Sequence, residues 1–302
     1  MILSLVLVLT LGDWIVAGQA ARKMLEDRLT SSARIASESL PYFLESGQSL
    51  ILDLAKPELV SLPYMQLMNR LEAGIHAVPY FKQLFVMNTD KELLAGYPMP
   101  DFSLTQPLDN QEKLALDFAL KGVLIQTYTV LPKTSGESAQ VSFIAALIDD
   151  HGNTRGVILG RTDLNSNPFT QPALAALEEI SRDGGEGYIL DESQNILYRA
   201  QQSTSLIQEE KYVSRIPEEA VFFEDVSATG TRQFIYYQPV VGKPWSVVVS
   251  IPARVAQEMA LNIAIPLLVI LIVFAMLAYA LIQISLGQLT RKLQRLEASA
   301  SL

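Results

Sequence analysis

The fold is decided by two stretches that align in residue type without a gap, Phe85-Val-Met-Asn-Thr-Asp-Lys-Glu-Leu-Leu94 and Tyr188-Ile-Leu-Asp-Glu-Ser-Gln-Asn-Ile-Leu197. Each begins with an apolar run, continues through a polar turn led by Asn88 or Asp191, and ends in a second apolar run. Asn and Asp favour such turns because their side chains bond the backbone a few residues on. Each stretch therefore predicts a β-hairpin, and together they indicate an internal repeat.

Each half of the repeat also ends in a second hairpin. In the first half, Val141–Ile148 turns into Gly156–Gly160, and the strand Val123–Val130 precedes them. In the second half, Phe234–Val241 turns into Trp245–Ile251. An early hairpin, a middle segment and a closing hairpin in each half predict two small antiparallel sheets with flanking helices, which is an α+β fold.

Two apolar segments bracket the repeat. Leu261–Ser285 carries no charge and is long enough to span a bilayer, for which about 20 residues suffice. The alternative is a buried core helix, although core helices are rarely so long and so uniformly apolar. Ile2–Ala17 is shorter and carries Asp13. We expect it to be an uncleaved membrane anchor, because no basic residue precedes it, and a cleaved signal segment ending near Ala20 is the alternative.

Basic residues set the expected orientation. Arg291, Lys292 and Arg295 follow the second apolar segment, and such clusters mark the cytoplasmic side of a membrane. The chain between the segments should then lie outside the cell. Arg22 and Lys23 argue against this orientation, but acidic residues accompany them. We expect a multi-pass protein of the bacterial inner membrane with an extracytoplasmic region.

Helical periodicity fills the chain before the first hairpin. Residues 21–46 carry an apolar stripe at three- and four-residue steps or their sums, formed by Leu25, Leu29, Ile35, Ala36, Leu40 and Phe43. Pro41 should kink or restart this helix. Pro57 opens a second helical stretch, whose apolar face holds Leu67, Leu71 and Ile75. The first stripe either forms a dimer seam or packs on its own domain.

Composition excludes several classes of function. The net charge of −9 argues against nucleic acid as a partner. The absence of cysteine excludes disulfides, thiolate zinc sites and cysteine nucleophiles. Asp149-Asp150-His151 could suggest a metal site, but it lies in a hairpin turn with Gly152. We expect neither a metal nor a cofactor, and no enzyme, because no catalytic motif is present.

The chain from residue 21 to 257 resembles the double Cache sensor domains of bacterial chemoreceptors and sensor histidine kinases. The pieces that carry the resemblance are ALIDDHGNTRGVILGRTDL (146–164), GYILDESQNILYRA (187–200) and YYQPVVGKPWSVVVSIP (236–252). The first apolar segment predicts a membrane helix over 1–20, and the resemblance implies a helical stalk over 21–79 and PAS-like modules over 80–170 (membrane-distal) and 171–257 (membrane-proximal). A second membrane helix over 258–285 follows.

Residues 286–302 resemble the start of a HAMP signalling module. Leu286, Leu289, Leu293 and Leu296 have the spacing of a heptad seam, which indicates a helix that pairs in a homodimer. We expect a signalling output domain beyond this segment.

In double Cache domains the distal module usually holds the ligand, in a mostly apolar pocket with a few polar groups. The candidates are Tyr97, Gln126, Tyr128, Ser142, Arg161 and Asp163. Arg161 and Asp163 could together hold a zwitterion or an organic acid. Alternatively, the tyrosines are edges of the core and Arg161–Asp163 is a surface pair. The Arg-x-Trp-Tyr motif of amino-acid-binding members is absent, which argues against an amino acid.

The expected function is extracytoplasmic sensing of a small metabolite and signal transduction across the membrane. The alternative is a membrane-anchored module for protein interaction or dimerisation without a small-molecule ligand. That alternative predicts a collapsed distal pocket and an exposed apolar patch.

Overall fold

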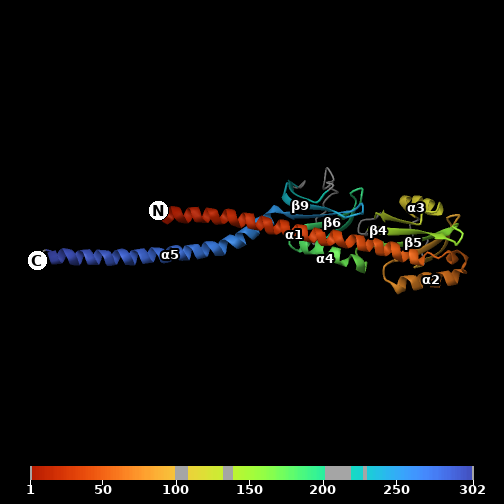
Figure 1. Cartoon of the computed structure of the whole chain (residues 1–302), viewed down its shortest axis with the longest axis horizontal. Coiled ribbons are helices and arrows are strands. Elements are labelled where there is room, and N and C mark those ends of the chain that lie inside the picture. The colour runs from red at the N-terminus through yellow and green to blue at the C-terminus, as the bar shows by residue number, and fades with distance from the viewer. Residues whose placement is uncertain (1, 99–107, 132–138, 201–218, 227–229, 301–302) are drawn as a thin grey trace. The chain divides into compact units, whose positions relative to one another are not determined.

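The computed structural model describes residues 2–98, 108–131, 139–200, 219–226 and 230–300 (Figure 1). The chain divides into two compact units. One comprises Met1–Arg28 and Pro252–Leu302, and the other comprises Leu29–Ile251. The second unit contains both of the sheets that the repeated hairpins predict, so the candidate sites all lie within it.

Helix α1 (Ile2–Leu54) continues through Pro41 without interruption, so the predicted restart of the helix at this proline is wrong. A proline inside a helix costs about 3 kcal/mol because it removes a backbone hydrogen bond and crowds the preceding turn. Leu40 and Phe43, on either side of Pro41, are both fully buried. Burying such side chains contributes about 1.5–3 kcal/mol each, which offsets the cost of the proline.

The apolar stripe of α1 is buried, with one exception. Within the second unit the buried positions recur at three- and four-residue steps or their sums, at Leu29, Ala33, Ala36, Leu40, Phe43 and Ile51. Ile35 was predicted to belong to this stripe but is 46% exposed, because the neighbouring Ala36 occupies the buried face. Ile35 and Tyr42, which lies seven residues further on, are instead exposed on another face of the helix.

The first module contains a five-stranded antiparallel sheet in the order β2-β1-β5-β4-β3. Its strands are β1 (Gln83–Asn88), β2 (Leu93–Tyr97), β3 (Ile125–Val130), β4 (Gln140–Ile148) and β5 (Thr154–Asp163). Its helices are η1 (Pro57–Ser61), α2 (Tyr64–Ala77) and α3 (Asn110–Leu120). α3 packs its alanines and Leu116 on one side of the sheet, which we call the α3 face. The other side packs on α1 and α2, where a Cβ on Gly160 would meet Phe81 and Ile51.

The second module repeats this topology. Its strands are β6 (Glu186–Leu190), β7 (Ile196–Ala200), β8 (Val221–Val226), β9 (Arg232–Pro239) and β10 (Ser246–Pro252). Their order, β7-β6-β10-β9-β8, is that of the first sheet strand for strand. The predicted pair of antiparallel sheets is therefore confirmed. The helices η2 (Pro168–Thr170) and α4 (Gln171–Arg182) lie between the two sheets in the sequence, and α4 packs on β6.

A shared turn structure explains why the hairpin sequences align. The Oδ1 atoms of Asn88, Asp149 and Asp191 each accept hydrogen bonds from the backbone N–H groups two and four residues on. In each turn the third residue after the Asn or Asp has a positive φ. The Asn153 N–H, followed by the Arg155 side chain, lowers the pKa of Asp149 to about 2. The Asp149 carboxylate therefore accepts hydrogen bonds from the residues of its own hairpin turn.

Helix α5 (Ala253–Ala300) follows β10 directly. Of the described residues, only its segment Ala253–Ile284 is long and apolar enough to cross a membrane, with a mean hydropathy of 2.9. Large apolar side chains such as Phe274 and Met276 are exposed, so the alternative of a buried core helix is wrong. The span expected at Ile2–Ala17 lies within α1, where side chains up to residue 11 lie outside the described part. The same holds for the side chains of the leucines in the heptad seam.

Candidate functional site

A buried ion pair lies between α3 and the first sheet. Arg161 of β5 donates from Nε to Glu112 Oε1 at 2.8 Å and from Nη2 to Glu112 Oε2. Ser142, which is opposite Arg161 on β4, donates its hydroxyl to Glu112 Oε1. Glu112 and Ser142 are fully buried, and Arg161 is 7% exposed. Both oxygens of this carboxylate are therefore bound by groups of the sheet.

The start of α3 holds Glu112 in place. Glu112 is the third residue of the helix, and Asp109 is its N-cap. The Asp109 N–H donates to Glu112 Oε2 at 2.8 Å, and a reciprocal bond from the N3 backbone to the Asp109 side chain completes a capping box. The guanidinium of Arg161 lies over the Phe85 ring at 5.5 Å, which adds a cation–π contact.

Gln126 and Tyr128 lie beside this ion pair on the same face. Tyr128 is opposite Ser142 in the register of β3 and β4. Its hydroxyl donates to Gln126 Oε1 at 2.9 Å, and Gln126 Nε2 donates to the Ala115 carbonyl oxygen of α3 at 2.9 Å. Burial, and then the negative charge of Glu192, raise the pKa of Tyr128. Four of the six predicted site residues are therefore gathered on the α3 face.

Asp163 does not pair with Arg161. Its carboxylate bonds Lys82 Nζ and accepts from the Ser166 N–H at 2.7 Å and the Ser166 hydroxyl at 2.9 Å. Burial alone would raise the pKa of Asp163, but the bonds from Lys82 and Ser166 outweigh it and lower the pKa. Arg161 and Asp163 are both buried and each has another partner, so the interpretation as a surface pair is wrong.

Tyr97 lies away from the α3 face. It is opposite Leu84 in the register of β2 and β1, and its hydroxyl donates to Glu72 Oε1 of α2 at 3.0 Å. The hydrogen bond to Glu72 raises the pKa of Tyr97. The Tyr97 ring also contacts His76 edge-on, with centroids 6.1 Å apart. The structure therefore does not bring Tyr97 together with the other candidates.

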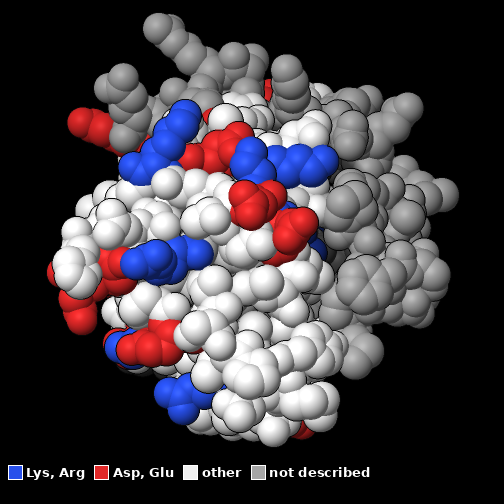
Figure 2. All heavy atoms as spheres, turned by 90° about the vertical axis from the view of Figure 1, so that its right-hand side faces the viewer, with Lys and Arg blue, Asp and Glu red and all other residues white. Residues whose placement is uncertain are grey.

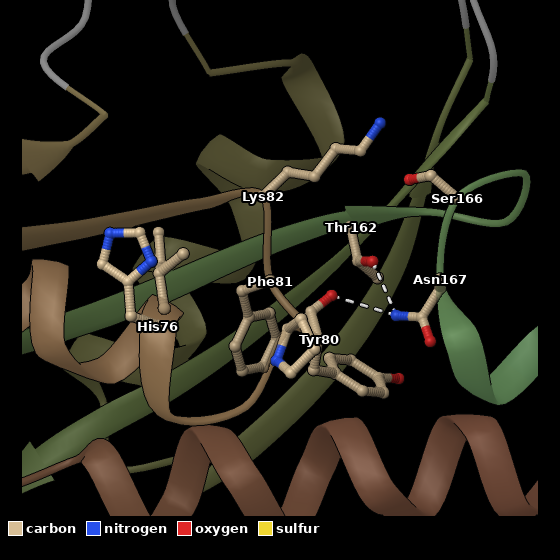
Figure 3. Close-up of a pocket in the computed structure, with 9 residues that line it drawn as sticks. His76, Tyr80, Phe81, Lys82, Thr162, Ser166 and Asn167 are labelled. Carbon is tan, nitrogen blue, oxygen red and sulfur yellow. Dashed lines mark hydrogen bonds between the residues drawn. The ribbon is translucent and has the colours of Figure 1, made fainter.

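A cavity of about 400 Å³ opens near the end of α2, the start of β1 and the end of β5. Figure 3 shows its lining, with His76 and Phe81 on one side and Thr162 and Asn167 on the other. Asn167 Nδ2 donates to the Tyr80 carbonyl oxygen and to Thr162 Oγ1, both at 2.9 Å. Lys82 and Ser166, the partners of Asp163, also line it. The volume is in the range of small-molecule sites.

Charges of opposite sign are paired on the exposed surface of the first module. Figure 2 shows acidic and basic side chains next to one another on the described part of one face. Lys91 pairs with Asp117, and Arg155 pairs with Asp149 at 2.7 Å. No group of three or more acidic or histidine side chains placed to hold a metal ion occurs among the described residues.

Contacts within the Leu29–Ile251 unit join the two modules. Thr129 of β3 donates its hydroxyl to Asp191 Oδ2 at 3.3 Å, at the turn between β6 and β7. The Trp245 ring, just before β10, lies 6.4 Å from the Phe43 ring of α1. Lys243 Nζ is 3.4 Å from Glu45 Oε1 in the same region. α1 therefore contacts the turn that leads into β10.

The fold is similar to that of solved bacterial sensor domains. The ligand-binding domain of the Pseudomonas fluorescens chemoreceptor CtaA, in complex with L-leucine, matches with a TM-score of 0.53 and 17% identity over 79% of this chain and 99% of that chain. The ligand-binding domain of the Pseudomonas aeruginosa PAO1 amino acid chemoreceptor PctC, in complex with GABA, matches with a TM-score of 0.55 and 17% identity. This match covers 75% of this chain and 99% of that chain. The sensory domain of the Campylobacter jejuni chemoreceptor Tlp3 matches with a TM-score of 0.51 and 13% identity, over 80% of this chain and 99% of that chain.

These similarities define the class of fold. It is that of double Cache ligand-binding domains of receptors, as the sequence resemblance implied. No protein-family model and no curated protein sequence matches the chain. Because all three identities are below 25%, the likeness is one of fold alone.

The residues of these sites that sequence reasoning missed include Glu112, Lys82 and Asn167. Glu112 had a detectable signal, since Asp109 and Glu112 have the spacing of a capping box. No sequence signal predicted that Glu112 is buried against Arg161, because this contact depends on how α3 packs on the sheet. Lys82 and Asn167 enter the lining of the cavity only through the tertiary fold.

Proposed function

We propose that this chain is the sensor region of a membrane receptor that binds a small metabolite in its first module outside the cell. The observation that carries the proposal is the repeated sheet topology, which the chain shares with ligand-binding domains of chemoreceptors. The first module corresponds to the membrane-distal module of the sequence interpretation. The exposed apolar segment of α5 supports a membrane span, and Ile2–Ala17 is the proposed first span.

We propose the α3 face as the ligand site, with Gln126, Tyr128, Ser142 and Arg161 near the ligand and Asp163 at the end of β5. Tyr97 contacts His76 instead, and His76 lines the cavity of Figure 3. Binding shifts the receptor only by the difference in affinity between its two states. The shift would pass through Thr129–Asp191 and through the Trp245 turn into α5 and the HAMP-like helix.

Thermal unfolding of the full chain in nanodiscs tests ligand binding. We expect at least one member of a panel of amines, alcohols, sugars and carboxylates to raise the melting temperature saturably, because a ligand of the folded state stabilises it by mass action. Tyr128→Phe should weaken the effect, and Tyr97→Phe, on the other side of the sheet, should not. The reverse pattern would assign binding to the cavity. No saturable shift with any compound would contradict the sensing function.

Single cysteines test the orientation, because the chain has none of its own. Val241 is 84% exposed in the Leu29–Ile251 unit. In intact cells, a membrane-impermeant maleimide should label Val241→Cys but label Lys292→Cys only after lysis. The opposite labelling would place the sensor region in the cytoplasm.

A homodimer is the proposed state of the receptor. The exposed Ile35 and Tyr42 on one face of α1 support it, because two apolar side chains seven residues apart are placed to meet a second helix. Disulfide formation by Ser31→Cys or Ser39→Cys on that face tests it. Monomers under oxidising conditions in both variants would oppose the dimer.

A further inference from the structure

Glu112 makes the contacts of a bound carboxylate ligand. Its Oε1 accepts from Ser142 and Arg161, and its Oε2 accepts from Arg161 and the Asp109 N–H. The two-point bond to Arg161 is the strongest arrangement by which a protein holds a carboxylate. A free carboxylate at this place would have no further donor to gain.

The groups that hold this carboxylate come from three separate elements. Arg161 is on β5, Ser142 is on β4, and the Asp109 N–H is at the start of α3. The Phe85 ring lies against the guanidinium. Because the two strands are interior strands of the sheet and are paired with each other, the sheet fixes the backbone positions of Arg161 and Ser142.

We infer that Arg161, Ser142 and the Asp109 N–H form a carboxylate-binding site, and that Glu112 of the same chain is its occupant. This site is built for small carboxylates, yet it is closed to free ones as long as Glu112 remains. Its chemistry also determines what the α3 face can recognise. The positive charge of Arg161 is already neutralised, so it attracts no organic acid.

A second observation points to the ligand class. Gln83 lies opposite Arg161 in the register of β1 and β5, on the α3 face. Its Oε1 is buried and has no hydrogen-bond partner among the described residues. An unpaired buried acceptor next to a neutralised arginine favours a ligand that donates hydrogen bonds and lacks a carboxylate, such as an amine or an alcohol. This consequence rests on the proposed function, whereas the occupied carboxylate site does not.

Removing the occupant tests the inference on the full chain in nanodiscs. Glu112→Ala should lower the melting temperature by about 10 °C, because Arg161 loses its buried partner. About 50 mM sodium acetate should then raise the melting temperature of the variant by roughly 3 °C or more relative to the same concentration of sodium chloride. The wild-type chain should not respond, because Glu112 occupies the site. If acetate has no more effect than chloride on the variant, the inference is overturned.

Two matched variants separate the carboxylate site from helix capping. Asp109→Ala loses the cap side chain but keeps Glu112, so acetate should not stabilise it. Glu112→Ala combined with Arg161→Met lacks the cation, and acetate should not stabilise it either. Equal stabilisation of either variant would overturn the inference. If Glu112→Ala does not fold in chloride, the yield of folded chain in acetate against chloride becomes the measurement, and equal yields count against the site.

The metabolite panel tests the proposed ligand class separately. In the metabolite panel, compounds that stabilise the wild-type chain through Tyr128 should carry amine or hydroxyl donors and no carboxylate. A carboxylate that stabilises the wild type, but not the Arg161→Met variant, would overturn this part. A panel without any stabilising compound would oppose the proposed function, while the acetate result on Glu112→Ala would still decide the carboxylate site.

Discussion

At the scale of single residues, burial separates two tyrosines that look alike in the sequence. The Tyr80 hydroxyl is buried and donates to the Phe43 carbonyl oxygen of α1 at 2.6 Å. Burial raises the pKa of Tyr80 far above its ordinary value, so the hydroxyl stays protonated and remains a donor. The Tyr97 hydroxyl donates to Glu72 at the surface. Both hydroxyls donate a hydrogen bond, but we expect only the buried one of Tyr80 to contribute appreciably to the free energy of unfolding.

Tyr80→Phe should lower the free energy of unfolding by about 1 kcal/mol, because a buried hydrogen bond between the first module and α1 is lost. Chemical denaturation of the full chain in detergent measures this. Tyr97→Phe is the matched control and should change the free energy by less than about 0.5 kcal/mol. A larger effect at Tyr97 than at Tyr80 would contradict the assignment of Tyr80 as the buried anchor.

Asp163 should make stability depend on acid pH. Its pKa is lowered in the folded chain by Lys82 and Ser166, so the folded state favours the ionised carboxylate. This contribution is fully present above the ordinary value of 3.8 and is lost as pH falls below it toward the lowered folded pKa. The melting temperatures of the wild type and Asp163→Asn should therefore differ more at about pH 7 than at about pH 3.

A surface ion pair provides the comparison for Asp163. Lys91→Met removes the partner of Asp117, and both side chains of that pair are exposed. The melting temperature of Lys91→Met should differ little from that of the wild type at both pH values. If the Asp163→Asn difference stays constant over the same range, Asp163 does not have the lowered pKa.

At the scale of elements, local chemistry made the hairpins predictable. The turns at Asn88, Asp149 and Asp191 are determined by side-chain bonds to the backbone two and four residues on, so the residues themselves carry the signal. The path of α1 through Pro41 carries no such signal, because distant packing stabilises it. The edge strand Val221–Val226 was not predicted individually, since its exposed residues lack a clear apolar face.

The candidate site was predictable only in part, for the same reason. Side chains alternate between the two faces of a strand, so Gln126 and Tyr128, two residues apart on β3, are expected on the same face, where their side chains bond each other. The contact between Arg161 and Glu112 joins residues 49 apart and depends on how α3 packs on the sheet. The alternative interpretation of Arg161 and Asp163 as a surface pair was wrong because each is buried against another partner, Glu112 and Lys82 respectively.

Gly47 of α1 marks the closest approach of this helix to the first sheet. A Cβ at Gly47 would collide with the Phe143 ring and the Tyr80 hydroxyl. In a free helix, Gly→Ala is stabilising by about 0.5–1 kcal/mol. Here we expect Gly47→Ala to destabilise by about 1–3 kcal/mol, because the well-packed aromatic rings must shift. Gly18→Ala, in the same helix with nothing within 4 Å of the added Cβ, is the control and should not destabilise. Equal effects in denaturation would contradict the close packing.

At the scale of the whole molecule, α1 and the closing turn of the second module are joined by an aromatic contact. Phe43 contacts Tyr80 and Phe143 of the first module and Trp245 of the second. The chain passes from Trp245 through β10 into α5 without an intervening loop. A change in the first module can therefore reach β10 through one ring of α1, while Thr129–Asp191 provides a second, weaker connection.

Trp245→Ala should uncouple the two modules without preventing ligand binding. The Trp245 ring packs near Phe43 of α1, whereas Arg161 and Tyr128 bond other residues on the α3 face. The affinity for a stabilising metabolite should therefore stay within about twofold of the wild-type value. The change in hydrogen exchange that this metabolite causes at residues 253–260 should disappear, because the contact between Phe43 and the closing turn is lost. Phe222→Ala removes a ring of the edge strand β8, stacked 5.8 Å from Phe234, and should leave both measurements unchanged. If Trp245→Ala leaves the exchange response intact, or if Phe222→Ala abolishes it equally, the signal does not pass through the aromatic contact at Phe43.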